Sequence, residues 1–208
     1  MASLLYKEFV TQRTAILLYL VLAMLYITQI LHVDLPFSLI SLLAMFFTVN
    51  TIAQEDKNNS HILINSLPIS RKEVVIAKYL FTIFFGLLLI GIALIYQTVF
   101  SSVMLEKDLF HAAMAIVFVI WFIAIYYPLY YWLGPRFVQI GWFIFFILSA
   151  ATMPMLINLG REHNYWGVVA LIQSVPVYIL GVMLCGLTGI ILLISLFLSV
   201  RLYEKKEF

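Results

Sequence analysis

The chain has 208 residues, of which 64% are hydrophobic and only 11% are Asp, Glu, Lys or Arg. A soluble domain carries roughly 25% charged residues, so this composition excludes a water-covered globular protein and predicts one that lies in lipid. The formal net charge of +2 is too small to indicate a nucleic-acid partner. The single cysteine, Cys185, excludes an intramolecular disulfide.

The chain begins with a partly polar stretch and then becomes strongly apolar. No small-residue cleavage site follows the first apolar segment, which predicts an uncleaved anchor and not a signal peptide. A helix needs about 20 mostly apolar residues to cross the membrane core. Six segments meet this requirement, and their continuous apolar runs indicate helices and not barrel strands; they are residues 14–31, 35–53, 74–100, 112–133, 137–159 and 176–200.

The loop between the second and third segments, residues 54–73, has the most informative pattern. Its centre, residues 60–67, can form about two helical turns with Leu63 and Leu67 on one face. Pro68 ends that turn, and Ser70 with Glu73 makes a capping box that starts the next helix. Such a protruding elbow suits the transmission of force from a docked protein. The alternative is a capped connector that only joins two spans.

Two patterns on later spans each leave two interpretations open. Tyrosines crowd the inner end of the fourth span, where they could form an interface belt or line a route for aromatic or amphipathic cargo. In the last span, small residues at i, i+4 and i+8 permit close helix packing, within one subunit or across a dimer. The residues concerned are Tyr126, Tyr127, Tyr130, Tyr131 and, in the last span, Gly181, Cys185 and Gly189.

The distribution of Lys and Arg predicts the orientation, because cytoplasmic loops carry an excess of them. With both termini inside, the cytoplasmic side holds ten of these residues and the outer side holds two, Lys107 and Arg161. The ten are Lys7, Arg13, Lys57, Arg71, Lys72, Lys78, Arg136, Arg201, Lys205 and Lys206.

The spans are predicted to lack an energy source of their own. All ten acidic residues, Glu8 and Glu55 among them, are expected in loops or at span ends, so no buried carboxylate relay is expected. The sequence contains neither an HExxH motif nor a GxxxxGK[ST] phosphate loop. A secondary transporter is therefore disfavoured, and any energy for transport must come from another subunit.

The motifs around the second loop resemble those of ABC-2-type permeases, the membrane subunits of ABC exporters. These motifs are Glu55-Asp56-Lys57, then Leu67-Pro68-Ile69-Ser70-Arg71, then Val75-x-x-Lys78-Tyr79. The resemblance implies that residues 54–67 hold a coupling helix that docks on an ATPase. The residues that it assigns to this role are Glu55, Asp56, Lys57, His61, Leu63, Leu67, Pro68 and Arg71.

The resemblance also implies an N-terminal interfacial helix over residues 4–10, with Tyr6, Lys7, Glu8 and Phe9; the alternative is an ordinary flanking segment. The outer segment, residues 158–176, would be a re-entrant hairpin or else a plain interfacial loop. Residues 1–208 would form one transmembrane domain in a bacterial plasma membrane, and this domain would pair with a second permease copy. A separate ATPase would bind ATP and Mg, and this chain would bind no cofactor and no metal.

We therefore expect an all-α membrane protein with six transmembrane helices and both termini inside. Because few polar groups are available to line a watery pore, the expected cargo is hydrophobic or amphipathic: peptides, lipophilic antibiotics or lipids. Exporters of amphipathic peptides, such as phenol-soluble-modulin exporters, are similar in size. The alternative function is a membrane anchor that docks a cytoplasmic protein and transports nothing.

Overall fold

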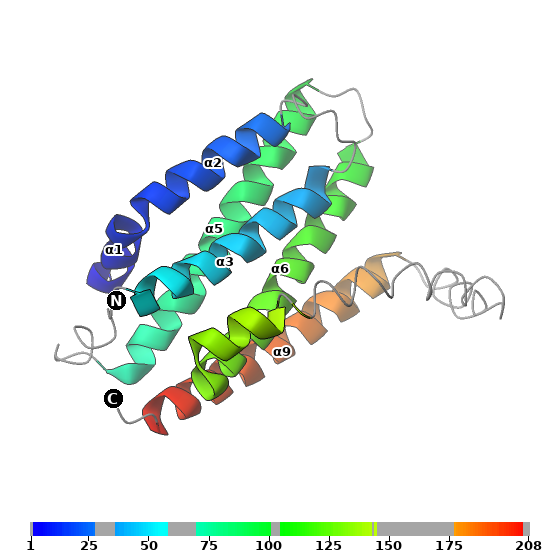
Figure 1. Cartoon of the computed structure of the whole chain (residues 1–208). Coiled ribbons are helices and arrows are strands. Elements are labelled where there is room, and N and C mark those ends of the chain that lie inside the picture. Colours follow the sequence, from blue (N-terminus) through cyan, green and yellow to red (C-terminus); the bar gives the residue numbers. More distant parts are fainter. Residues whose placement is uncertain are drawn as a thin grey trace.

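The computed structural model describes residues 2–27, 36–57, 70–100, 105–142, 144 and 177–205, and over these residues the regular structure is entirely helical (Figure 1). A further helical stretch follows α6 over residues 135–142. The main helices are α1 (Ala2–Thr11), α2 (Arg13–Ile27), α3 (Pro36–Lys57), α5 (Arg71–Phe100), α6 (Leu105–Leu133) and α9 (Val177–Lys205).

Three described helical segments are long and apolar enough to cross a membrane: Arg71–Val99, Leu109–Leu133 and Gly181–Lys205. The pair Leu4–Thr11 and Arg13–Leu25, bent by 65°, would add a fourth if it forms one broken span. The prediction of an all-α membrane protein is confirmed. Six spans and the orientation stay predictions, and the outer segment at 158–176 lies outside the described residues.

The helices extend beyond the apolar segments from which they were predicted. α3 continues to Lys57 and α5 starts at Arg71, so Glu55, Asp56 and Lys57 belong to the last turns of a helix and not to a loop. Hydropathy marks only the part of a helix that suits lipid, whereas the backbone hydrogen bonds continue through polar residues. The connector that was predicted as residues 54–73 is therefore shorter.

In the helix packing, α3, α5 and α6 contact one another, with α2 against α3 and α9 against α6 and α5 (Figure 1). Aromatic rings fill much of the space between them. Phe47 of α3 stacks on Phe85 of α5 with ring centroids 3.7 Å apart, and Tyr79 stacks on Tyr127 of α6 at 4.6 Å. At Gly86, a Cβ would lie 3.0 Å from the Val119 side chain, so glycine permits the close approach of α5 and α6.

A proline inside α6 creates the polar contact that joins α6 to α9. Pro128 has no N–H, so the carbonyl of Ala124, four residues earlier, lacks its usual helical donor. The Ser195 hydroxyl of α9 donates to that carbonyl at 2.6 Å. Because the single hydroxyl hydrogen of Ser195 is used in that bond, Ser195 accepts from the Tyr79 hydroxyl at 2.7 Å, and Ser199 in turn donates to Tyr79 at 2.7 Å. One chain of hydrogen bonds thus links α5, α6 and α9.

We predict that Ser195→Ala lowers the free energy of unfolding by about 1 kcal/mol, the size of a hydrogen bond between membrane helices. In a Pro128→Ala background the loss should shrink, because residue 128 then supplies an N–H for the Ala124 carbonyl. Unfolding in mixed detergent micelles, followed by circular dichroism, measures both. Thr98→Val is the control, since the exposed Thr98 hydroxyl donates to Ile95 O of its own helix. Equal losses in both backgrounds would contradict the explanation.

Candidate functional site

The N-terminal residues form a helix whose two faces differ. Leu4 and Glu8, four residues apart on α1, are buried, whereas Tyr6 is 73% exposed and Phe9 51% exposed. The chain then bends by 65° into α2. Gln12 lies at this bend, where its side-chain amide donates to the Thr51 carbonyl of α3 at 3.3 Å. α1 therefore turns Glu8 toward the bundle and Tyr6 away from it, while the half-exposed Phe9 ring lies edge-on to Phe81 of α5, with ring centroids 6.4 Å apart.

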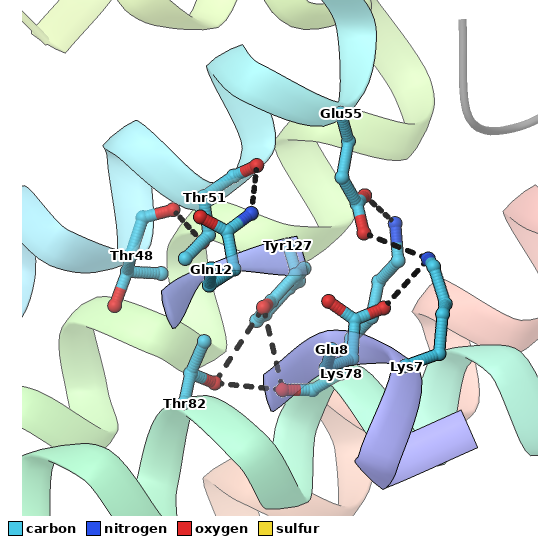
Figure 2. A network of polar contacts seen from close by, with 9 residues as sticks. All are labelled: Lys7, Glu8, Gln12, Thr48, Thr51, Glu55, Lys78, Thr82 and Tyr127. Carbon is cyan, nitrogen blue, oxygen red and sulfur yellow. Dashed lines mark hydrogen bonds and ion pairs between the residues drawn. The ribbon is translucent and has the colours of Figure 1, made fainter. Parts of the chain in front are cut away.

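Four charged side chains from three helices meet at this end of the bundle, and we call them the charged cluster (Figure 2): Lys7, Glu8, Glu55 and Lys78. The Lys7 ammonium lies 3.1 Å from a Glu8 oxygen and 3.6 Å from Oε1 of Glu55. The other oxygen of Glu55, Oε2, pairs with the ammonium of Lys78. Glu55 is only 3% exposed, and Lys78 is 8% exposed. Two lysines and two glutamates thus share a largely buried site, in which Lys7 is the most exposed of the four side chains.

Polar groups of α5 and α6 surround the charged cluster. The Tyr127 hydroxyl donates to the Lys78 carbonyl at 3.4 Å, and the Thr82 hydroxyl donates to the same carbonyl at 2.9 Å. The Lys78 ammonium also lies 5.8 Å from the centre of the Tyr130 ring, within range of a cation–π contact. A buried charge is tolerated only where partners replace water. The Lys78 ammonium has Glu55 and the Tyr130 ring as such partners, whereas the two hydroxyls bind the Lys78 backbone carbonyl.

The charged cluster corrects the expectation that no carboxylate is buried. Glu55 does lie at the end of a span, in the last turn of α3, and Glu8 lies in α1, but both side chains are buried. A signal was present in the sequence: Lys78 interrupts the apolar run that starts at Val74, and a lone cation there requires a counter-charge. The sequence could not identify Glu55 as its partner, because the two are separated by 23 residues.

The start of α5 is fixed by two sets of contacts. The predicted capping box is confirmed: the Ser70 hydroxyl lies 2.9 Å from Glu73 Oε2, and the Glu73 N–H donates to the Ser70 hydroxyl at 3.3 Å. Arg71 donates to the carbonyls of Tyr203 and Glu204, at 3.2 and 2.8 Å. These carbonyls end α9 and have few helical donors. Arg71 therefore ties the start of α5 to the end of α9.

The other predicted coupling residues are placed only in part. Asp56 is half-buried and Lys57 is exposed at the end of α3. His61, Leu63, Leu67 and Pro68 lie outside the described residues, so their coupling role stays a prediction.

The four predicted tyrosines, Tyr126, Tyr127, Tyr130 and Tyr131, are buried in the helix packing. The structure therefore does not support an interface belt for them, although the neighbouring Trp132 is 70% exposed. Tyr127 and Tyr131 stack at 6.2 Å, and Tyr131 contacts the Tyr203 ring of α9 at 5.2 Å. The fourth span was predicted from hydropathy alone, which cannot distinguish tyrosines that face lipid from tyrosines that face a neighbouring helix.

The small residues of α9 have no packing partner among the described residues. Gly181, Cys185 and Gly189 are exposed, and no neighbouring atom lies within 4 Å of a Cβ built at either glycine. The predicted packing of this stripe within one subunit is therefore not supplied by the described part of the chain.

An apolar groove of about 450 Å³ opens between α2, α3, α6 and residues 135–142. Its walls include Tyr19, Phe46, Phe122 and Trp142, with the amides of Asn50 and Gln139 as polar groups. None of the four predicted tyrosines lines it. Among the described residues, no group of three or more His, Cys, Asp or Glu could hold a metal ion.

We predict that Glu55→Met destabilises the fold by about 3–5 kcal/mol, the usual cost of removing one partner of a buried ion pair. Lys78→Met should cost less, because Glu55 keeps Lys7 as a partner. The double variant should cost less than the sum of the two, since no unpaired charge then remains between α3 and α5. The same micelle unfolding assay gives these values, and additive losses would show that the two residues do not act as a pair.

Comparison with known proteins agrees with this architecture. A family model described as ABC-2 family transporter protein matches residues 3–204. Searches of curated proteins and of solved structures found no match. The matched range covers nearly all of the chain and overlaps every helix described above. The chain therefore belongs to the ABC-2 family of transporter proteins, the permeases of ABC transporters.

Proposed function

We propose that this chain is the permease subunit of an ATP-driven exporter, and that the charged cluster transmits movement from a docked ATPase into the membrane helices. The observation that carries this proposal is the place of the cluster. Glu55 lies two residues before the end of α3, and Lys78 lies in the third turn of α5. The connection between these two helices contains residues 58–67, the larger part of the segment 54–67 that was predicted to hold the coupling helix.

A displacement of residues 58–69 would be transmitted to several helices through polar contacts. Through Lys7, the charged cluster joins α1 to α3 and α5. Through Arg71, the start of α5 is tied to the end of α9. Through the Tyr127 hydroxyl, α6 contacts the same turn of α5. An ATPase that displaces this connector therefore has a continuous set of polar contacts through which to move the bundle.

Energy for transport would come from the partner. A separate ABC ATPase subunit would bind ATP and Mg, and this chain would bind no cofactor and catalyse no reaction alone. A second permease copy, identical or related, would complete the pathway in a bacterial plasma membrane. Outward transport is inferred from the resemblance to ABC exporters.

The apolar groove favours a hydrophobic or amphipathic cargo, such as a peptide, a lipophilic antibiotic or a lipid. Its aromatic and aliphatic walls suit apolar groups, and its two amides, Asn50 and Gln139, can hydrogen-bond one polar group. Its volume of about 450 Å³ is within the range of ligand pockets, about 300–1,000 Å³. Export of amphipathic peptides is the narrower form of this proposal.

Docking of the ATPase is tested by replacing the two leucines of the predicted coupling helix. We predict that Leu63→Asp with Leu67→Asp abolishes co-purification of the ATPase, because two charges would replace the apolar face that docks. Leu63→Met with Leu67→Met keeps an apolar face of similar volume and should retain the ATPase. Size-exclusion chromatography checks that all variants are folded. An ATPase that stays bound to the Asp variant would contradict docking at these residues.

Transmission through the charged cluster is tested separately. We predict that Lys7→Gln retains the ATPase but slows ATP-dependent transport into vesicles by roughly tenfold, within the range of coupling energies of about 1–3 kcal/mol. The variant loses the link from α1 to Glu55 while the pair of Glu55 and Lys78 remains. Lys72→Gln, which removes an exposed cation from the same end of α5, should transport normally.

Two outcomes would argue against transmission. Unchanged transport by Lys7→Gln would mean that the charged cluster only stabilises the fold. A wild-type complex that binds the ATPase but moves no cargo would favour the alternative function, a membrane anchor.

A further inference from the structure

A second groove lies between the end of α6 and the last turns of α9, on a part of the molecule that the proposed function does not use. Its volume is about 430 Å³. Pro128 and Trp132 of α6 form one wall, and Leu198 and Leu202 of α9 form the other. In Figure 1 this is where the α9 ribbon, red at its C-terminal end, passes beside α6.

Two cations line this groove. Arg201 and Lys205 are one helical turn apart on α9, so they share a face. Both are exposed, and neither forms an ion pair with any residue in the described part of the chain. The Arg201 guanidinium lies 4.5 Å from the centre of the Phe197 ring, a cation–π contact one turn earlier on the helix.

The groove also lies where the apolar part of the chain ends. The sequence from Gly189 to Val200 contains no charged residue, and Arg201 is the first cation after it. Trp132, 70% exposed, lies in the same groove, and tryptophan is enriched at the boundary between lipid and water. The end of α6 and the end of α9 were both predicted at the cytoplasmic side of the membrane. On that side, anionic lipids give the membrane surface a negative potential.

We propose that this groove binds an anionic phospholipid, with its phosphate between Arg201 and Lys205 and its acyl chains along Trp132 and Leu198. Basic pockets between transmembrane helices on the cytoplasmic side are typical binding places of such headgroups. Charge complementarity selects an anion, and the apolar walls select one that carries hydrocarbon. A free phosphate ion would leave these walls unused. Bound lipid would bridge α6 and α9 beside the Tyr131–Tyr203 contact.

The experiment measures lipid retention by the full chain in mild detergent, using native mass spectrometry. The two probes are phosphatidylglycerol and phosphatidylcholine with the same acyl chains, so that only the headgroup charge differs. The wild-type protein should retain phosphatidylglycerol preferentially. Arg201→Gln with Lys205→Gln should reduce this retention at least fivefold, whereas Arg201→Lys with Lys205→Arg, which keeps both charges, should restore most of it.

The matched control is Arg13→Gln with Lys72→Gln, which removes two exposed cations away from the groove; it should retain the lipid as the wild type does. Three results would overturn the proposal: equal loss in the control, unchanged retention in the groove variant, or binding of inorganic phosphate that depends on Arg201 and Lys205 by a protein that retains no phosphatidylglycerol. The last would indicate a phosphate site without a lipid. Because the assay uses neither ATP nor an ATPase, its failure would leave the proposed permease function untouched.

Discussion

The buried ion pair of Glu55 and Lys78 is the constraint on which the arrangement of this bundle depends. Each charge alone would cost several kcal/mol to remove from water, so α3 and α5 must meet where the two side chains can pair. Lys7 adds a third contact and thereby fixes α1 against the same point. Close packing of the rings of Phe47 and Phe85 also holds α3 against α5, but a shift that separates the buried ion pair leaves two unpaired charges, so the pair adds a strong preference for one register.

A second buried polar contact, between α6 and α9, holds the other side of the bundle together, and it too satisfies a group that would otherwise have no partner. Pro128 frees a carbonyl within α6, and Ser195 of α9 satisfies it. Helices in lipid gain little hydrophobic free energy from burial against each other, so van der Waals packing and specific polar contacts together decide how they associate. In both places one group cannot be satisfied within its own helix, either the charge of a buried lysine or a carbonyl that a proline leaves without a donor, and it requires a particular neighbour.

Those features of the fold that depend on residues close together in the sequence could be predicted from it. The apolar runs predicted helices at the positions where α2, α3, α5, α6 and α9 lie, and the Ser70–Glu73 capping box depends on four consecutive residues. The pairing of Glu55 with Lys78 depends on how two helices pack, which hydropathy does not encode. The same limit applies to the tyrosines of α6: composition places them near an interface, but the neighbouring helices decide that they are buried.

The distribution of polar and apolar contacts also indicates where the bundle can move if residues 58–69 receive the force of an ATPase. Separating α3 from α5 would expose or unpair buried charges, and separating α5 and α6 from α9 would break the Ser195 hydrogen-bond chain. The contacts of α2 and of residues 135–142 around the apolar groove are largely apolar. Among the described residues no ion pair crosses that boundary, although Tyr19 of α2 hydrogen-bonds Asn50 of α3 there. A shift at this boundary, with α3, α5, α6 and α9 held together, would change the shape of the groove.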